Sequence, residues 1–488
     1  MNWDTIIVGA GSAGCVLAAR LSEDPQHRVL LIEAGPDFDA DDPPRQVAFL
    51  GQGHGWPIEW GETVASSDGR VLPYLRGRGT GGSSAINGGV AMRAEPPDFT
   101  MWPRGWQWDE MLPWLCKIEA DAEFGHEPWH GDGGPVSIVR WPTERWTPTQ
   151  RAFHEACQAR GIPDCPDHNA PNTTGVGPIP MNRDGKRRLS ALITHLGPAR
   201  SRPNLQVRGE TAVSRVWLES GQARGVELTG GERIEGGRVI AAAGVLQTPL
   251  LLWRSGVGPA EDLSERGIPV EVPLEGVGAG WTDHMVIQLS TPIDPSWVPP
   301  GPPGLQTLAR VTAPESPWTN DLQLTPWLER TASDAYQMNL SISLQQPFGE
   351  ARITAPSADP SERGQFDWRF PAEPRNTERL RHGFREGARI MAQTGMALDP
   401  SGLERAIAQS DEALDEWISV HHGAFYHGCG SCRMGDDEAS PVGPDCQVRG
   451  TRGLYVVDAS AIPRVPRSNT HLVVMALAEA AAARLQAG

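Results

Sequence analysis

The chain begins with an apolar β-branched run, a turn rich in glycine and an apolar helical run, all within residues 4–24 (DTIIVGAGSAGCVLAARLSED). Gly9 permits the sharp turn out of the strand, and Gly11 lets the main chain approach a pyrophosphate. Gly14 allows the helix to pack closely on the sheet. This order predicts a parallel α/β sheet that binds a dinucleotide, with the diphosphate at the N-terminal amides of the helix.

A second predicted strand, VLLIEAG, contains Glu33, 24 residues after Gly9. A carboxylate at this distance typically accepts hydrogen bonds from ribose hydroxyls and repels a 2'-phosphate. Glycine turns also occur for packing alone, which is the other interpretation. The strand before the turn, the helix after it and the acid beyond favour a bound dinucleotide.

Length, hydropathy and charge limit the classes of protein that fit. The 488 residues suffice for two or three domains, 39% are hydrophobic, and we find no apolar stretch of membrane-spanning length. The fingerprint starts within ten residues of Met1, which leaves no room for a signal peptide, so we expect a cytoplasmic protein. A net charge of −17 argues against nucleic acid or an anionic membrane as partner.

The seven cysteines are odd in number and dispersed, so we expect reduced thiols and no structural disulfide. Cys429 and Cys432 form a CGSC motif, for which a thiol redox pair or half of a zinc site is the alternative. The sequence has no second CxxC motif, so we predict no metal site. His421 and His422 are expected to be solvated or packed.

A second glycine cluster, RGRGTGGSSAINGGVAMR, spans residues 76–93. Such a run can place several backbone N–H groups around a phosphate or a flat ring; a plain flexible loop is the alternative. Further along, PSWVPPGPPG at 295–304 marks a break. The alternating segments 320–329 (NDLQLTPWLE) and 336–345 (YQMNLSISLQ) after it predict half-buried antiparallel strands.

The last seventy residues contain two candidate catalytic histidines, His427 in AFYHGCGSCRMG and His471 before the closing helix. An imidazole with an ordinary pKa of about 6.5 can accept a hydroxyl proton at neutral pH. Most histidines in proteins are packed or solvated rather than catalytic. Their spacing alone therefore decides nothing.

Seven motifs occur in an order that resembles the glucose-methanol-choline (GMC) family of flavoenzymes, which oxidise alcohols. Besides the N-terminal turn, they are GRGTGGSSAIN (77–87), GVLQTPLLLWRSGVG (244–258), GVGAGWTDH (276–284), YHGCGSCRMG (426–435) and the pair VDAS (457–460) and SNTH (468–471). The resemblance covers nearly the whole chain. It implies an FAD-binding Rossmann-like domain and a second, substrate-binding domain built on an antiparallel sheet.

The resemblance also implies which residues hold FAD. They are Gly9, Gly11, Ser12, Ala13, Gly14, Glu33 and Ala34 at the ADP half, Arg78, Gly79, Gly82, Ser83, Asn87, Gly88, Gly89 and Val90 in the second glycine loop, Val213 at the adenine, and Asp458, Ala459 and Thr470 in the C-terminal turns. Ile86 stands where some relatives have a histidine joined covalently to the flavin. We therefore expect non-covalent FAD.

His427 matches the active-site histidine of that family, and His471 aligns with a second position that is histidine or asparagine among relatives. Both imidazoles are expected to converge beside the flavin, one taking the hydroxyl proton and the other holding the oxygen. His427 is favoured as the base from its family position alone. Which of the two takes the proton stays open.

The expected reaction is oxidation of a sugar, polyol or ring-bearing alcohol to an aldehyde or ketone by hydride transfer to flavin N5. The electron acceptor is oxygen or another acceptor, and bulky Phe425 favours slow reaction with oxygen. A non-redox, FAD-containing lyase like the hydroxynitrile lyases, a nicotinamide enzyme and a binding protein are the alternatives. The expected assembly is a monomer or homodimer.

The expected domains interleave along the chain. The FAD-binding domain is assembled from 1–140, 196–290 and 425–488, and the substrate-binding domain from 141–195 and 291–424.

Overall fold

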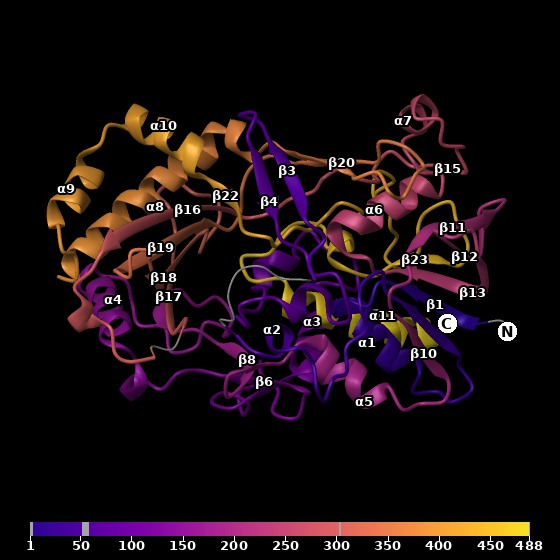
Figure 1. The fold of residues 1–488 in the computed structure, drawn as a ribbon, viewed down its shortest axis with the longest axis horizontal. Helices are drawn as coiled ribbons and strands as arrows, with labels where there is room; N and C mark the ends of the chain where they lie inside the picture. Colours follow the sequence, from indigo (N-terminus) through magenta and orange to yellow (C-terminus); the bar gives the residue numbers. More distant parts are fainter. Residues whose placement is uncertain (1–2, 51–57, 302–303, 488) are drawn as a thin grey trace.

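The computed structural model describes residues 3–50, 58–301 and 304–487, which form two lobes side by side (Figure 1). One lobe, at the right in Figure 1, is built on the sheet that contains β1. The other is built on β16 to β19 and carries α8, α9 and α10 on its outer side. The two ends of the chain lie together in the first lobe.

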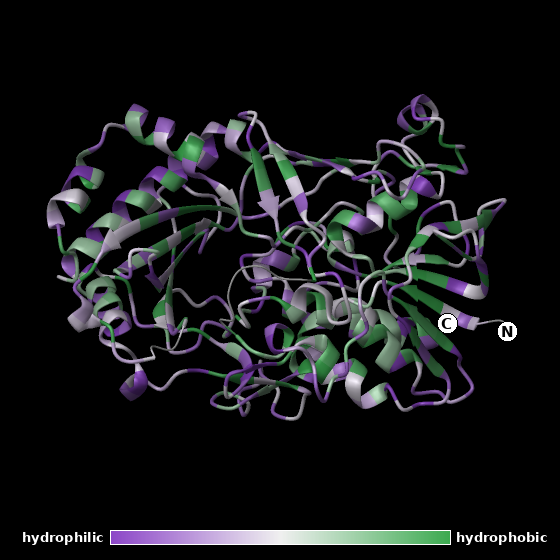
Figure 2. Cartoon of the chain, in the orientation of Figure 1, coloured by the Kyte–Doolittle hydropathy of each residue, from purple (hydrophilic) through white to green (hydrophobic). Residues whose placement is uncertain are grey.

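The first lobe contains a parallel sheet flanked by helices. Its strands are β10 (Leu205–Arg208), β2 (Val29–Ile32), β1 (Trp3–Val8), β13 (Arg233–Ala241) and β23 (Leu454–Val456), in that order, and antiparallel β12 (Gln222–Leu228) and β11 (Val213–Glu219) extend it from β13. Ile6, Ile7 and Val8 of β1 and all of β2 are buried, and Figure 2 shows the strands of this sheet as mainly hydrophobic. Strands covered by helices on both faces have this composition.

The N-terminal helix α1 (Ser12–Leu21) packs against the C-terminal helix α11 (His471–Ala487). Glu479, buried in α11, fixes this contact: it accepts a 2.8 Å hydrogen bond from Arg20 of α1 and forms a 2.9 Å ion pair with Lys117 of α3 (Trp108–Ile118). Because α1 and α11 begin side by side, residues 459 positions apart in the sequence reach one location.

The second lobe contains a six-stranded sheet. Its order is β22 (Gly423–Ala424), β16 (Met285–Pro292), β19 (Tyr336–Leu344), β18 (Leu322–Arg330), β17 (Thr307–Val311) and β7 (Gly175–Pro178), all antiparallel. Helix α8 (Pro374–Gln393) covers one face, with α4 (Pro148–Ala159), α9 (Pro400–Ala408) and α10 (Asp411–His421) beside it. The strands predicted at 320–329 and 336–345 are confirmed as β18 and β19.

In two places, strands that were expected to belong to different domains pair with each other. Strand β16 begins at Met285 and lies wholly in the second sheet, so the expected limit at 290 falls inside a strand. The hairpin of β3 (Glu62–Ser66) and β4 (Val71–Tyr74) joins β21 (Gln365–Trp368) and β20 (Arg352–Thr354) in one sheet. We propose that the limit lies before β16 and that this mixed sheet connects the domains.

The remaining elements are short. They are the sheet of β5 (Glu119–Asp121), β6 (Val136–Val139), β8 (Met181–Asp184) and β9 (Arg187–Arg188), the pair β14 (Val257–Gly258) and β15 (Val272–Pro273), and the helices α2 (Arg45–Ala48), α5 (Gly197–Ala199), α6 (Gly244–Arg254) and α7 (Ala260–Glu265). All seven cysteines are free. Across the described residues, no helix combines the length and apolar character needed to cross a bilayer.

Candidate active site

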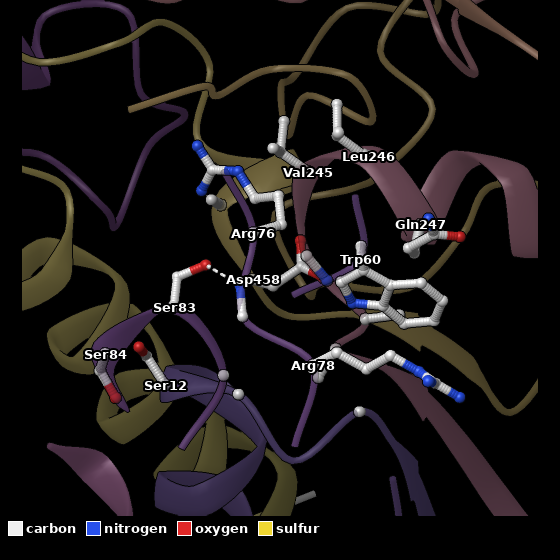
Figure 3. A pocket seen from close by; sticks show the side chains of 18 of the residues that line it. Ser12, Trp60, Arg76, Arg78, Ser83, Ser84, Val245, Leu246, Gln247 and Asp458 are labelled. Atoms are coloured by element: carbon white, nitrogen blue, oxygen red, sulfur yellow. Dashed lines mark hydrogen bonds between the residues drawn. The ribbon is translucent and has the colours of Figure 1, made fainter. Parts of the chain in front are cut away.

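One cavity of about 670 Å³ extends from the start of β11 past the N-termini of α1 and α11 to His427. Its volume lies within the range of about 300–1,000 Å³ that is typical of ligand sites. Figure 3 shows the hydroxyls of Ser12, Ser83 and Ser84 on one side of the view, and Trp60 and Gln247 on the other.

The three glycines of the N-terminal turn differ in what a Cβ atom would meet at each position. Gly9 has φ +104°, and a Cβ there would lie 2.5 Å from the Ala242 carbonyl oxygen. A Cβ on Gly14 would lie 1.8 Å from the Gly9 carbonyl oxygen, so only glycine lets α1 approach the turn this closely. A Cβ on Gly11 would meet no protein atom within 4 Å, because Gly11 lines the cavity.

Two helices begin at this part of the cavity. The first residues of α1 and α11 are joined by a 3.2 Å hydrogen bond between Ser12 Oγ and His471 Nδ1. The second glycine loop also reaches this location, since a Cβ on Gly82 would lie 2.7 Å from Gly11 Cα. Free N–H groups and the helix dipole make such N-termini favourable for an anionic group.

Glu33 is buried at the end of β2 and accepts three backbone hydrogen bonds, from Ala10 (2.8 Å), Gly35 (2.9 Å) and Gly79 (3.0 Å). Burial raises the pKa of its carboxyl group, and these N–H groups oppose the shift. A carboxylate offers about four acceptor positions, so about one is left for a ligand. Besides lining the cavity, Glu33 therefore joins the first glycine turn to the second.

Asp458 is also surrounded by protein donors. Its Oδ2 accepts from the Gly244 amide (2.8 Å) and Thr248 Oγ1 (2.6 Å), and its Oδ1 accepts from the amide and hydroxyl of Ser460 (2.7 and 2.5 Å). These four bonds fill its acceptor positions. The side chain thus anchors α6 to the C-terminal turn, although the residue lines the cavity.

Most of the predicted cofactor-binding residues line this single cavity. They are Gly9, Gly11, Ser12, Ala13, Glu33, Ala34, Arg78, Gly82, Ser83, Asn87, Gly88, Val90, Val213, Asp458, Ala459 and Thr470. Gly14, Gly79 and Gly89 do not line it. Gly79 and Gly89 have φ of +139° and +69°, and they shape the second loop rather than face the cavity.

His427 is held from both ring nitrogens. Its Nδ1 lies 3.0 Å from Nδ1 of His284, and its Nε2 lies 3.1 Å from Nδ2 of Asn469. Burial lowers the pKa of His427 well below its ordinary value, and His284 and the Arg76 guanidinium lower it further. The imidazole is therefore neutral near pH 7 and can accept a proton.

The structure does not pair the two predicted imidazoles by a hydrogen bond. The side chain that it brings to His427 Nε2 is that of Asn469, two residues before His471. His471 is the first residue of α11 and bonds to Ser12 instead. Burial lowers the pKa of His471 to about 4, with His195 adding to the shift, so this side chain is neutral too.

Beneath His427 lies a buried carboxylate that sequence reasoning missed. Asp283 Oδ1 accepts from the amides of His284 (2.7 Å) and His427 (2.8 Å), and its Oδ2 accepts from the Tyr74 hydroxyl (2.5 Å). Tyr426, just before His427, has φ +65°, and its carbonyl accepts from Arg76. These contacts fix the backbone that carries His427.

A signal for these residues was present in the sequence. Asp283 and His284 end the GVGAGWTDH motif, and Asn469 belongs to the SNTH turn. What the motifs do not give is which side chains face one another.

Known proteins match nearly the whole chain. Residues 3–286 and 347–478 match the N-terminal and C-terminal family models described as GMC oxidoreductase. A 5-(hydroxymethyl)furfural oxidase of Methylovorus sp. (strain MP688) is 32% identical over 522 residues, which cover 98% of this chain and 97% of that protein. A pyridoxine 4-oxidase of Microbacterium luteolum is 31% identical, with 98% of each chain covered. The crystal structure of pyridoxine 4-oxidase from Mesorbium loti superimposes with a TM-score of 0.88 at 28% identity and covers 100% of both chains.

Proposed function

The chain belongs to the GMC oxidoreductase family, and we propose that it oxidises the alcohol group of a small organic molecule with non-covalent FAD as cofactor. The observation that carries this proposal is that one cavity joins the glycine turn of α1 to the pair His427 and Asn469. A cofactor that fills the cavity would extend from the first to the second.

The residues present fit FAD. Gly11 leaves open the space that a Cβ would fill, and the N-termini of α1 and α11 suit a diphosphate. Val213 and Thr211 line the end near β11, where the adenine would lie. Ile86 lines the cavity and offers no nucleophile for a covalent bond. When bound, FAD supplies the acceptor for the hydride that leaves the alcohol carbon.

His427 and Asn469 have complementary roles in this proposal. In the neutral imidazole, Nε2 carries the lone pair to which Asn469 Nδ2 donates. An alcohol hydroxyl that replaces this donor can pass its proton to His427 Nε2. The Asn469 amide donates a hydrogen bond to the alcohol oxygen as it gains negative charge. The alcohol loses one proton and one hydride and becomes a carbonyl.

A ring-bearing primary alcohol is the substrate class that we propose. Two relatives with full-length coverage are named for ring compounds, 5-(hydroxymethyl)furfural and pyridoxine. Apolar Ile86, Val90, Leu305 and Phe425 line the cavity together with His427, and such side chains suit a flat ring.

The electron acceptor is a separate question. The names of those two relatives include the word oxidase, whereas Phe425, whose ring centroid lies 5.1 Å from that of His427, supports slow reaction with oxygen. Fast re-oxidation of the reduced enzyme in air-saturated buffer would contradict the role given to Phe425.

The test uses purified, FAD-loaded protein mixed anaerobically with a panel of ring-bearing alcohols, while the loss of visible flavin absorbance is followed. We expect one or more of them to bleach the flavin. His427→Gln should slow bleaching by about 10²- to 10⁴-fold. Asn469→Ala should slow it by about 10²- to 10³-fold.

His471→Ala is the comparison variant. It should mainly raise the FAD concentration needed for loading. An equal loss of bleaching rate in FAD-saturated His471→Ala would overturn the assignment to Asn469. Aldehyde release from a cyanohydrin without any bleaching would identify the lyase alternative instead.

A further inference from the structure

His284 is a buried histidine that the proposed reaction does not use directly. It lies between Asp283 and Met285, the first residue of β16, and its side chain is fully buried. Its Nε2 lies 2.8 Å from the Pro466 carbonyl oxygen, and its Nδ1 lies 3.0 Å from Nδ1 of His427. It thus lies between a main-chain acceptor and the proposed base.

The Pro466 carbonyl determines which atom is the donor in each of these two hydrogen bonds. A carbonyl oxygen only accepts, so His284 carries its proton on Nε2. Burial lowers the pKa of His284 to about 4, so its other nitrogen, Nδ1, is an acceptor at neutral pH. His427 must therefore donate from its Nδ1 to His284.

The proton on His427 Nδ1 also determines the state of its Nε2, which faces the cavity. A neutral His427 with its proton on Nδ1 has its lone pair on Nε2, and Asn469 Nδ2 donates to that lone pair. Asn469 could not select this tautomer by itself. Rotation of its amide by half a turn would present the oxygen to a protonated Nε2, and that nitrogen could then accept no proton.

We propose that His284 is a positioning residue, which holds His427 in the tautomer whose unprotonated Nε2 can take the alcohol proton. This inference rests on the proposed function. His284 touches neither the alcohol nor the cofactor in this role and acts through His427 alone.

The loop that supplies the Pro466 carbonyl is itself fixed. Arg467 Nε donates to buried Asp98 Oδ1 (2.8 Å), and its Nη1 donates to the Thr319 carbonyl (3.0 Å). On the other side, the Val465 amide donates to Thr282 Oγ1 (2.9 Å). Residues 465–469 thus carry both the acceptor for His284 and the amide that meets His427 Nε2.

Two substitutions separate this role from simple packing. In His284→Asn, Oδ1 can take the place of the ring Nδ1 and accept from His427. In His284→Leu, a side chain of comparable size offers no acceptor. In FAD-loaded enzyme we expect His284→Leu to slow flavin bleaching by about 10²- to 10⁴-fold, as for a base in the wrong tautomer. His284→Asn should recover most of this loss.

A second readout needs neither substrate nor turnover. In protein labelled with ¹⁵N-histidine, long-range ¹H–¹⁵N correlations distinguish protonated from unprotonated ring nitrogens, and the signals absent from His427→Gln identify those of His427. We expect an unprotonated Nε2 in the wild type and in His284→Asn, and a protonated or mixed Nε2 in His284→Leu.

A wild-type spectrum with protonated Nε2 would overturn the inference, as would equal bleaching rates in the Leu and Asn variants. If His284→Leu does not fold, the spectra of the wild type and of His284→Asn still show whether His427 Nε2 is unprotonated, as the inference requires. If no alcohol bleaches the flavin of the wild type, the proposed function fails, but the spectra still report the tautomer.

Discussion

Replacement of Gly11 by alanine should abolish most cofactor affinity without harming the fold. Gly11 has φ −74° and ψ −163°, which alanine adopts readily, and the added Cβ meets no protein atom within 4 Å. The free energy of unfolding of the apoprotein should therefore change by no more than about 0.5 kcal/mol. The methyl group would instead enter the cavity where a diphosphate is proposed to lie.

Overpacking of a close contact typically costs about 1–3 kcal/mol, which corresponds to a loss of FAD affinity of about 5- to 150-fold. Gly14→Ala is the matched control, because its Cβ would lie 1.8 Å from the Gly9 carbonyl oxygen, inside the protein. That variant should lose about 3 kcal/mol or more of stability.

Urea denaturation of each apoprotein gives the stabilities, and titration with FAD followed by flavin fluorescence gives the affinities. A Gly11→Ala variant that binds FAD as tightly as the wild type, or that is destabilised as much as Gly14→Ala, would refute the placement of the diphosphate at Gly11.

Three further outcomes are expected. Acid precipitation should leave the flavin in the supernatant; a yellow pellet would show a covalent bond and contradict the inference from Ile86. On α8, Gly387→Ala should destabilise by about 1–3 kcal/mol, because its Cβ would lie 2.8 Å from Leu340 Cδ2. Gly402→Ala in α9, with only Arg405 Nη2 at 3.9 Å, should stabilise by about 0.5–1 kcal/mol; urea denaturation tests both, and equal effects would argue against the packing of α8. Buried His130 bonds to Glu119 (2.7 Å) and Asp167 (2.9 Å), and although burial opposes the shift, these bonds raise its pKa to about 9. Its charged form thus contributes stability that is complete below about pH 6.5 and is lost as the pH rises through about 9, by about 3 kcal/mol in all; denaturation of the wild type and His130→Gln over this range should show the slope only in the wild type.

The sequence by itself determined the features that depend on neighbouring residues. The turn at Gly9, Gly11 and Gly14 follows from backbone geometry over a few residues, and strands β18 and β19 follow from the alternation of apolar and polar side chains. The order of motifs was sufficient to indicate the family.

Only the tertiary structure decided which side chains meet. His471 begins α11 and so faces Ser12 of α1, whereas Asn469, two residues earlier in the turn, faces His427. Motif spacing could not show which of Asn469 and His471 faces His427, because the direction of each side chain depends on where α11 starts and how it packs.

The same holds for the hydrogen bonds behind the site. His284 and Pro466 are 182 positions apart in the sequence and are joined by a hydrogen bond. Glu33 and Gly79 are likewise hydrogen-bonded and are 46 positions apart. No local pattern specifies such contacts. They arise because the packing of α1 on α11 and the pairing of β16 with β19 bring distant parts of the chain to one cavity, where buried polar groups must find partners.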